Sequence, residues 1–140
     1  MRELPRQLSV EELTELFSGR TPLVDRLAEV DDPLGDGAAR VLAELDDEAK
    51  FAALAAHPRI GERSPEQHGD EPEVLAELAE LNRRYEERFG FRFVVFVNRR
   101  SRAEIVPVLR ERLARSREQE LDEGVRALVD IARDRWTGST

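Results

Sequence analysis

The sequence predicts an all-α fold, a single-domain irregular helical bundle over residues 1–140 with one short extended segment. Three observations favour this fold class. Apolar residues recur at helical spacing along most of the 140-residue chain, and residues typical of helix starts precede them. Only 6% of the residues are aromatic, so the core must consist mainly of Leu, Val and Ala, and Leu and Ala lose little freedom in helices. One strand-like run occurs, and a single run cannot form a sheet.

The first two helices are predicted from their start signals. Ser9 and Glu12 have the spacing of a capping box, in which the side chain of each accepts a hydrogen bond from the backbone of the other. Gly19 is typical of the end of the helix that follows. Thr21 and Pro22 indicate a second start, because proline suits the first helical position. The apolar faces of the two helices consist of Leu13, Leu16, Phe17, Leu23, Val24 and Leu27.

Two further helices and a long loop follow. Turn residues cluster at 31–37, and after them we expect a short helix over about 38–45 and another over about 46–56. From His57 to Glu71 the chain holds two prolines and two glycines, which predicts an irregular loop. Loops of this length inside compact domains are usually functional or disordered.

A long helix and the extended segment come next. Apolar residues at helical spacing begin near Pro72 and continue to about Phe89, where Gly90 is typical of a helix end. The run 91–97 is aromatic and β-branched, so it favours an extended conformation. Because no partner run exists elsewhere in the sequence, we expect this run to be a buried extended segment outside any sheet.

Two helices complete the chain. Ser101 and Glu104 form a second capping box. Pro107 lies past the first turn of that helix and should kink it or delay its start. The last helix is expected over about 118–136, because its apolar residues fall on one stripe.

Charge and composition exclude several classes of function. The net charge of −8 repels phosphate backbones and anionic lipids, so we expect neither nucleic acid nor a membrane as a partner. The absence of cysteine excludes thiol catalysis, disulfides and thiolate metal sites. No stretch approaches the roughly 20 apolar residues of a membrane helix, and the amino terminus lacks the apolar run of a signal peptide. The predicted compartment is the cytoplasm.

His57 is the first candidate for chemistry. A histidine at a helix end is commonly a cap or a surface residue. Pro58 follows it directly, which disfavours helical backbone at position 57 and turns the chain. A histidine held at the junction of a helix and a loop can project into a cleft, and its pKa near neutrality suits proton transfer. The only other histidine is His68, and the spacing of the pair matches no metal-ligand pattern, so we expect no metal.

Four polar residues each have two interpretations. Glu66 and Gln67 are either solvated loop residues or a carboxylate and an amide that hold a substrate or orient the imidazole. Asn82 either bonds a loop carbonyl or faces water. Arg100 could pair with a substrate carboxylate, although most of the 22 basic residues must be solvated. The residues alone indicate an acid–base site and leave these alternatives open.

Four motifs occur in order along the chain: Ala56-His57-Pro58-Arg59-Ile60-Gly61, Ser64-Pro65-Glu66-Gln67, Leu81-Asn82 to Tyr85, and Phe89-Gly90-Phe91-Arg92-Phe93-Val94. Together they resemble the OHCU decarboxylase family, whose substrate is 2-oxo-4-hydroxy-4-carboxy-5-ureidoimidazoline, the third intermediate of urate oxidation. The likeness spans about residues 18–135 and also includes Ser101–Ile105, Arg112-Leu113 and Glu120-Leu121.

The resemblance implies an all-α homodimer that uses no cofactor and forms (S)-allantoin from a small ureido-imidazoline. It implies that His57 and Glu66 are catalytic. The implied substrate-binding residues are Pro58, Arg63, Ser64, Gln67, Phe93, Val94, Val95, Phe96 and Val97, the last five through their backbone groups. The chain departs from the family at two places: Arg63 stands where many members have serine, and Asn98-Arg99-Arg100 replaces a glycine before a basic residue.

Two alternatives to this enzyme remain. The chain would be a non-catalytic helical binding module if His57-Pro58 only caps a helix. It would be an acid–base enzyme on another ureide if the site is catalytic but the substrate differs.

Overall fold

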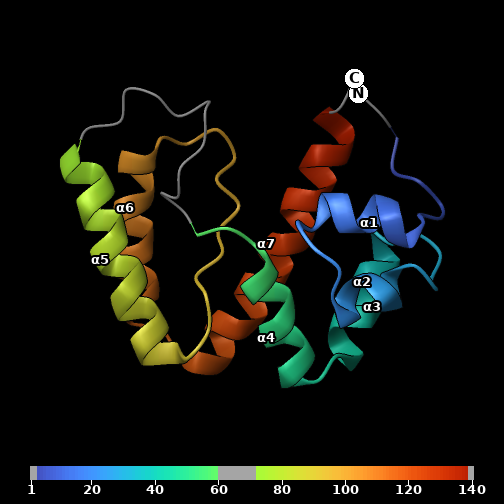
Figure 1. The fold of residues 1–140 in the computed structure, drawn as a ribbon, viewed down its shortest axis with the longest axis horizontal. Coiled ribbons are helices and arrows are strands. Elements are labelled where there is room, and N and C mark those ends of the chain that lie inside the picture. Colours follow the sequence, from blue (N-terminus) through green and yellow to red (C-terminus); the bar gives the residue numbers. More distant parts are fainter. Residues whose placement is uncertain (1–2, 60–71, 139–140) are drawn as a thin grey trace.

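The computed structural model describes residues 3–59 and 72–138, and this part of the chain is helical without any strand. The predicted all-α fold class is confirmed. The helices are α1 (Val10–Leu16), α2 (Pro22–Leu27), α3 (Asp36–Glu44), α4 (Asp47–Ala56), α5 (Pro72–Phe89), α6 (Arg102–Arg112) and α7 (Arg117–Gly138) (Figure 1). No helix among the described residues is long and apolar enough to cross a membrane.

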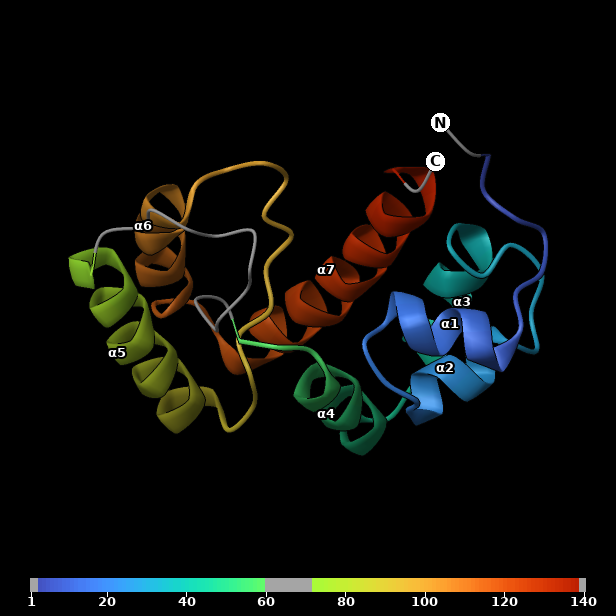
Figure 2. The same cartoon turned by 45° about the horizontal axis from the view of Figure 1, so that its top comes forward.

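The long helix α7 connects two groups of helices (Figures 1 and 2). The first group, α1–α4, packs on itself and on α7. The second group is the pair α5 and α6, which lie side by side. Residues 91–97 return along this pair from the end of α5 to the start of α6, so both helices run in the same direction (Figure 1).

The helix starts follow local side-chain chemistry. Ser9 and Glu12 form the predicted capping box of α1, and Ser101 and Glu104 form that of α6. In α2 the Thr21 hydroxyl accepts the amide of Val24, with Pro22 at the first helical position, as predicted. Each cap satisfies a backbone donor that the first helical turn leaves without a partner.

Two helices start earlier than the sequence predicts, and a third starts where its capping box predicts. Helix α3 begins at Asp36, two residues early, because the Asp32 carboxylate accepts the Asp36 amide at 2.9 Å. Helix α7 begins at Arg117, one residue early, because Ser116 and Gln119 form a reciprocal cap. Pro107 does not delay α6, which starts at its capping box and continues through the proline.

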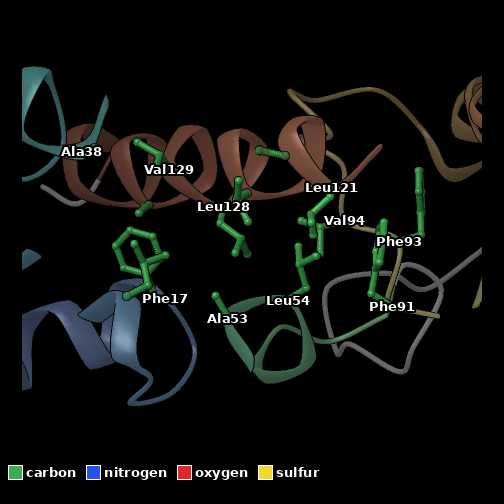
Figure 3. Packing of buried hydrophobic residues seen from close by; sticks show 14 of the residues in the cluster. Phe17, Ala38, Ala53, Leu54, Phe91, Phe93, Val94, Leu121, Leu128 and Val129 are labelled. Atoms are coloured by element: carbon green, nitrogen blue, oxygen red, sulfur yellow. The ribbon is translucent and has the colours of Figure 1, made fainter. Parts of the chain in front are cut away.

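The core has two parts of different composition. Around α1–α4 and α7 it consists of aliphatic side chains and Phe17, and Figure 3 shows Leu54 of α4 pointing towards Leu121 of α7. Beside α5 the core is aromatic. Tyr85, Phe89, Phe91 and Phe93 pack ring against ring there, with centroid distances of 4.6–6.0 Å.

The segment 91–97 lies between the two parts of the core. Phe91, Phe93 and Val94 are buried, whereas Val95–Val97 are half-buried. At the start of the segment Gly90 has a φ of +80°, a conformation that favours glycine. At its end Asn98 and Arg99 have φ values of 49° and 66°, so the chain turns sharply into α6.

Candidate functional site

His57 is the C-cap residue of α4. Its φ and ψ are −86° and 138°, so it leaves the helix in extended conformation, as Pro58 after it requires. The His57 amide donates to the carbonyl of Leu54 at 3.2 Å, which closes the last turn. His57 is half-buried, with the Nδ1 atom of its ring buried, and Pro58 after it is exposed.

Arg92 fixes this helix end from the other group of helices. Its Nη1 donates to the carbonyl of Ala55 at 2.9 Å and to the carbonyl of His57 at 2.7 Å. The C-terminal carbonyls of a helix have no partner within the helix, and a cation at that end also favours the helix dipole. Arg92 therefore joins the His57 backbone directly to the start of the extended segment.

Arg59 makes a second connection between the groups. Its guanidinium donates to both carboxylate oxygens of Glu86 on α5, at 2.6 and 3.0 Å. These hydrogen bonds are the main reason why the pKa of Glu86 lies below its usual value, and the charge of Arg92 lowers it further. The chain on both sides of Pro58 is thus held to α5 and to the extended segment.

The backbone of the extended segment presents unused donors. Within the described part of the chain, no amide N–H from Phe93 to Val97 donates a hydrogen bond. Several of its carbonyls, in contrast, accept from arginines: that of Val94 from Arg112, and those of Phe96 and Val97 from Arg100. The segment therefore has the side chains of Phe93 and Val94 in the core and part of its carbonyls occupied. Its amides donate to no described residue, and those of Val95–Val97 belong to half-buried residues.

A buried polar cluster of Tyr85, Arg112 and Glu120 holds the segment in place. Glu120 is fully buried, and one of its oxygens accepts from the Tyr85 hydroxyl at 2.6 Å and from Arg112 Nε at 2.7 Å. The Arg112 guanidinium also lies over the Phe93 ring, 4.7 Å from its centroid. Burial first, and then the Glu120 carboxylate, raise the pKa of Tyr85 far above its usual range.

The sequence analysis gave no role to this cluster or to Arg92. The motifs contained all four residues, but helical periodicity treats Tyr85 as an apolar position and Arg112, Glu120 and Arg92 as solvated charges. A detectable signal did exist for Glu120, because it directly precedes Leu121 at the edge of the apolar stripe of α7.

The predicted site residues fall into two sets. Of the described ones, His57 and Pro58 lie at the end of α4, and Phe93–Val97 directly follow Arg92, whose side chain bonds the His57 carbonyl. Arg63, Ser64, Glu66 and Gln67 lie outside the described residues, as does His68.

Two other polar candidates are described. Asn82 is buried, 4% exposed, so the water-facing alternative for it is wrong. Arg100 is exposed and donates to carbonyls of the segment, and its pairing with a substrate stays a prediction.

A cavity of about 620 Å³ lies elsewhere, between α3 and α7. Its lining combines aliphatic residues with charged residues of both signs, among them Lys50, Asp122 and Arg126. Lys50 is already paired with Asp122. None of the predicted site residues lines this cavity, and it holds no histidine, so its size gives no reason to move the candidate site away from His57.

The comparison with protein families decides the assignment. The family model of OHCU decarboxylase matches residues 2–137, nearly the whole chain. The chain belongs to the OHCU decarboxylase family. The predicted family is confirmed, and with it the enzyme class, a decarboxylating carboxy-lyase. Formation of allantoin in urate degradation is the activity that goes with this family.

Solved structures show the same fold. A crystal structure of OHCU decarboxylase in the presence of (S)-allantoin has a TM-score of 0.76 and 22% sequence identity, with 92% of this chain and 99% of that chain covered. A crystal structure of (S)-allantoin synthase has a TM-score of 0.71 and 18% identity, and the match covers 92% of this chain but only 48% of that one. Curated protein sequences gave no match.

Proposed function

We propose that this protein decarboxylates 2-oxo-4-hydroxy-4-carboxy-5-ureidoimidazoline to (S)-allantoin, with His57 as the acid–base residue. One observation carries the proposal of the site. The row of unused amides from Phe93 to Val97 begins one residue after Arg92, which bonds the His57 carbonyl. The ring and ureido oxygens of this substrate accept hydrogen bonds, and such a row of N–H groups can hold them next to the imidazole.

The reaction suits a site without a cofactor. The bond from the ring carbon to the carboxylate breaks, CO2 departs, and the electron pair moves into the adjacent ring C=N. The substrate is thus its own electron sink, the task that pyridoxal phosphate performs elsewhere. The ring nitrogen that receives the pair takes up a proton from water. A proton must then reach one face of the neighbouring carbon, and the hydroxyl proton must leave as the carbonyl of allantoin forms. A histidine titrating near neutrality can perform both transfers.

The remaining roles follow the family resemblance. Glu66 holds the substrate and tunes the imidazole of His57. The proposed contacts to the rest of the substrate come from Pro58, Arg63, Ser64 and Gln67 and from the backbone of Phe93, Val94, Val95, Phe96 and Val97. We also propose that the enzyme is a homodimer in the cytoplasm. Analytical ultracentrifugation tests the dimer, since a monomer at micromolar concentration would contradict it.

Freshly prepared urate oxidation products and the purified protein test the activity. We expect the optical rotation of (S)-allantoin to develop faster than in a sample without protein, where spontaneous decay gives a racemate. Racemic allantoin at the spontaneous rate would exclude the proposed reaction and would favour a binding module. If the protein turns over another ureide and leaves this substrate unchanged, the alternative of an acid–base enzyme with a different ureide substrate is favoured.

A further inference from the structure

The C-terminal end of α4 is stabilised by a residue that is distant in sequence. The last turn of α4 contains no basic residue of its own, and the cation at this end is Arg92, 35 positions beyond His57. A single nitrogen of Arg92, Nη1, donates to the carbonyls of both Ala55 and His57. Both hydrogens of that nitrogen are therefore used on the backbone of one helix end.

We propose that Arg92 is a positioning residue for His57 in the decarboxylation, acting through the carbonyl of His57 rather than on the substrate. This inference rests on the proposed function, because it assumes that the His57 imidazole transfers the proton. Fixing the His57 carbonyl fixes the peptide plane next to the Cα from which the imidazole projects. Arg92 thus sets the direction of the imidazole relative to the amides of Phe93–Val97, which follow Arg92 directly in the chain.

The surroundings of Arg92 favour this role. The side chain of Arg92 is half-buried, and its Nε atom is buried and makes no hydrogen bond to the described part of the chain. The bonds of its Nη1 to the end of α4 are therefore its hydrogen bonds to these residues. The guanidinium is also electrostatically coupled to Glu86, which itself binds Arg59 on the other side of Pro58. The backbone is therefore held at His57 by Arg92, and the side chain of Arg59, two residues later, is held by Glu86.

Arg117 provides a matched control for Arg92. It also connects distant elements, since its Nε donates to the carbonyl of Phe89 at the end of α5, at 3.0 Å. Its guanidinium lies over the rings of Phe51 and Phe91, at 5.0 and 5.5 Å from their centroids. Arg117 thus stabilises a helix end beside the same aromatic cluster, but it makes no contact with the His57 backbone among these interactions. Its removal measures the effect of a lost structural arginine.

The test compares R92M, R92K and R117M in the full chain, each assayed well below its melting temperature. We expect R92M to lower kcat by roughly 10–100-fold, because a small misplacement of a reacting group has effects of this size. KM should change much less, since proton transfer matters in the transition state and not in substrate binding. R92K should recover part of kcat because the ammonium can still donate to one or both carbonyls. R117M should keep the kcat of the unchanged protein.

Nuclear magnetic resonance of the imidazole rings gives a readout that does not depend on turnover. The chain has only two histidines, so H57A assigns the signals by difference. R92M should shift the ring signals of His57, and R117M should leave them in place.

Each outcome decides the inference separately from the proposed function. If the unchanged protein turns over the substrate and R92M retains its kcat, or loses no more than R117M, Arg92 does not position His57. If the unchanged protein is inactive, the proposed function fails and the ring signals decide. Unshifted His57 signals in R92M would then also refute the positioning role, and shifted signals would support it. If R92M does not fold, R92K gives the same comparison with a smaller expected loss.

Discussion

The two groups of helices are attached to α7 by different chemistry. The buried part of the contact between α1–α4 and α7 consists of aliphatic side chains such as Leu54 and Leu121 (Figure 3). The polar bonds between them, such as Lys50 to Asp122, involve side chains that are exposed or partly buried. The second group meets α7 through a buried polar contact. The carboxylate of Glu120 on α7 accepts from the Tyr85 hydroxyl of α5 and from Arg112 of α6. An aliphatic contact tolerates small rotations, whereas hydrogen bonds to a buried charge require one geometry. The difference indicates that the polar contact fixes the position of the segment 91–97 relative to α7.

The position that is specified is that of the proposed substrate-binding backbone. Arg112 joins Glu120 to the carbonyl of Val94, the second residue of the row of unused amides. A buried ion pair is weak evidence for added stability, because its desolvation offsets much of the attraction. We therefore interpret the cluster as the contact that fixes the backbone of the segment that follows Arg92.

The largest expected effect is a loss of turnover that leaves both contacts with α7 unchanged. His57→Ala should lower turnover by about 10²–10⁴-fold, because one proton-transfer group is lost. The backbone hydrogen bonds of the helix end remain, so neither the aliphatic nor the polar contact to α7 should change. Turnover by optical rotation and fold by far-UV circular dichroism check the two halves of this prediction. A rate close to that of the unchanged protein would remove His57 from the mechanism.

Breaking the polar contact is expected to have the next largest effect. Glu120→Ala leaves the guanidinium of Arg112 buried without its carboxylate, which typically costs about 3–5 kcal/mol. Urea unfolding monitored by the single tryptophan measures the change. The control is Glu118→Ala, an exposed glutamate in the same helix turn, for which we expect a change below about 0.5 kcal/mol. Equal losses in both variants would show that the cluster stabilises nothing specific.

Alkaline pH should weaken the polar contact through Tyr85. The raised pKa of Tyr85 means that its phenol stays protonated in the folded chain, whereas the unfolded chain loses the proton near pH 10. The contribution is therefore complete below pH 10 and is lost as pH rises above it, by up to about 1.4 kcal/mol per pH unit. The difference between the unchanged protein and Tyr85→Phe, measured by urea unfolding from pH 9 to 11, isolates it. Parallel pH dependences would contradict the prediction.

The separation of interacting residues along the chain explains which features the sequence could predict. Both capping boxes were predictable because Ser9 with Glu12, and Ser101 with Glu104, lie three residues apart. Periodicity likewise predicted the aliphatic faces around α7. The bond from Arg92 to His57 spans 35 residues and exists only after the two groups of helices pack, so no local pattern contains it.

The same argument applies inside the candidate site. His57 could be predicted as a site residue from itself and the proline that follows, because the conformational effect of proline is local. The buried cluster joins three helices, and its members look like solvated charges until α7 places Glu120 next to Tyr85. The start of α3 was wrong for a related reason, because the side chain of Asp32 caps it from inside a turn-rich segment.

The smallest expected effect tests how tightly the aliphatic contact is packed. A Cβ added at Gly124 of α7 would lie 3.0 Å from the Cδ2 of Leu54, closer than normal contact. Gly124→Ala gains up to about 1 kcal/mol of helix propensity, but overpacking a core costs about 1–3 kcal/mol. The single change should therefore be mildly destabilising. Leu54→Val removes the crowded methyl groups and leaves space near the same point of α7.

The double variant gives the sign of the coupling. In the Leu54→Val background the new methyl of Gly124→Ala occupies part of the vacated space, so the substitution should stabilise the protein there. Contacting residues show coupling energies of about 0.5–3 kcal/mol in such cycles. Urea unfolding of the four proteins measures it. A coupling near zero would mean that α4 can move away from α7 without a cost in free energy. The aliphatic contact would then be loosely packed, in contrast to the polar contact.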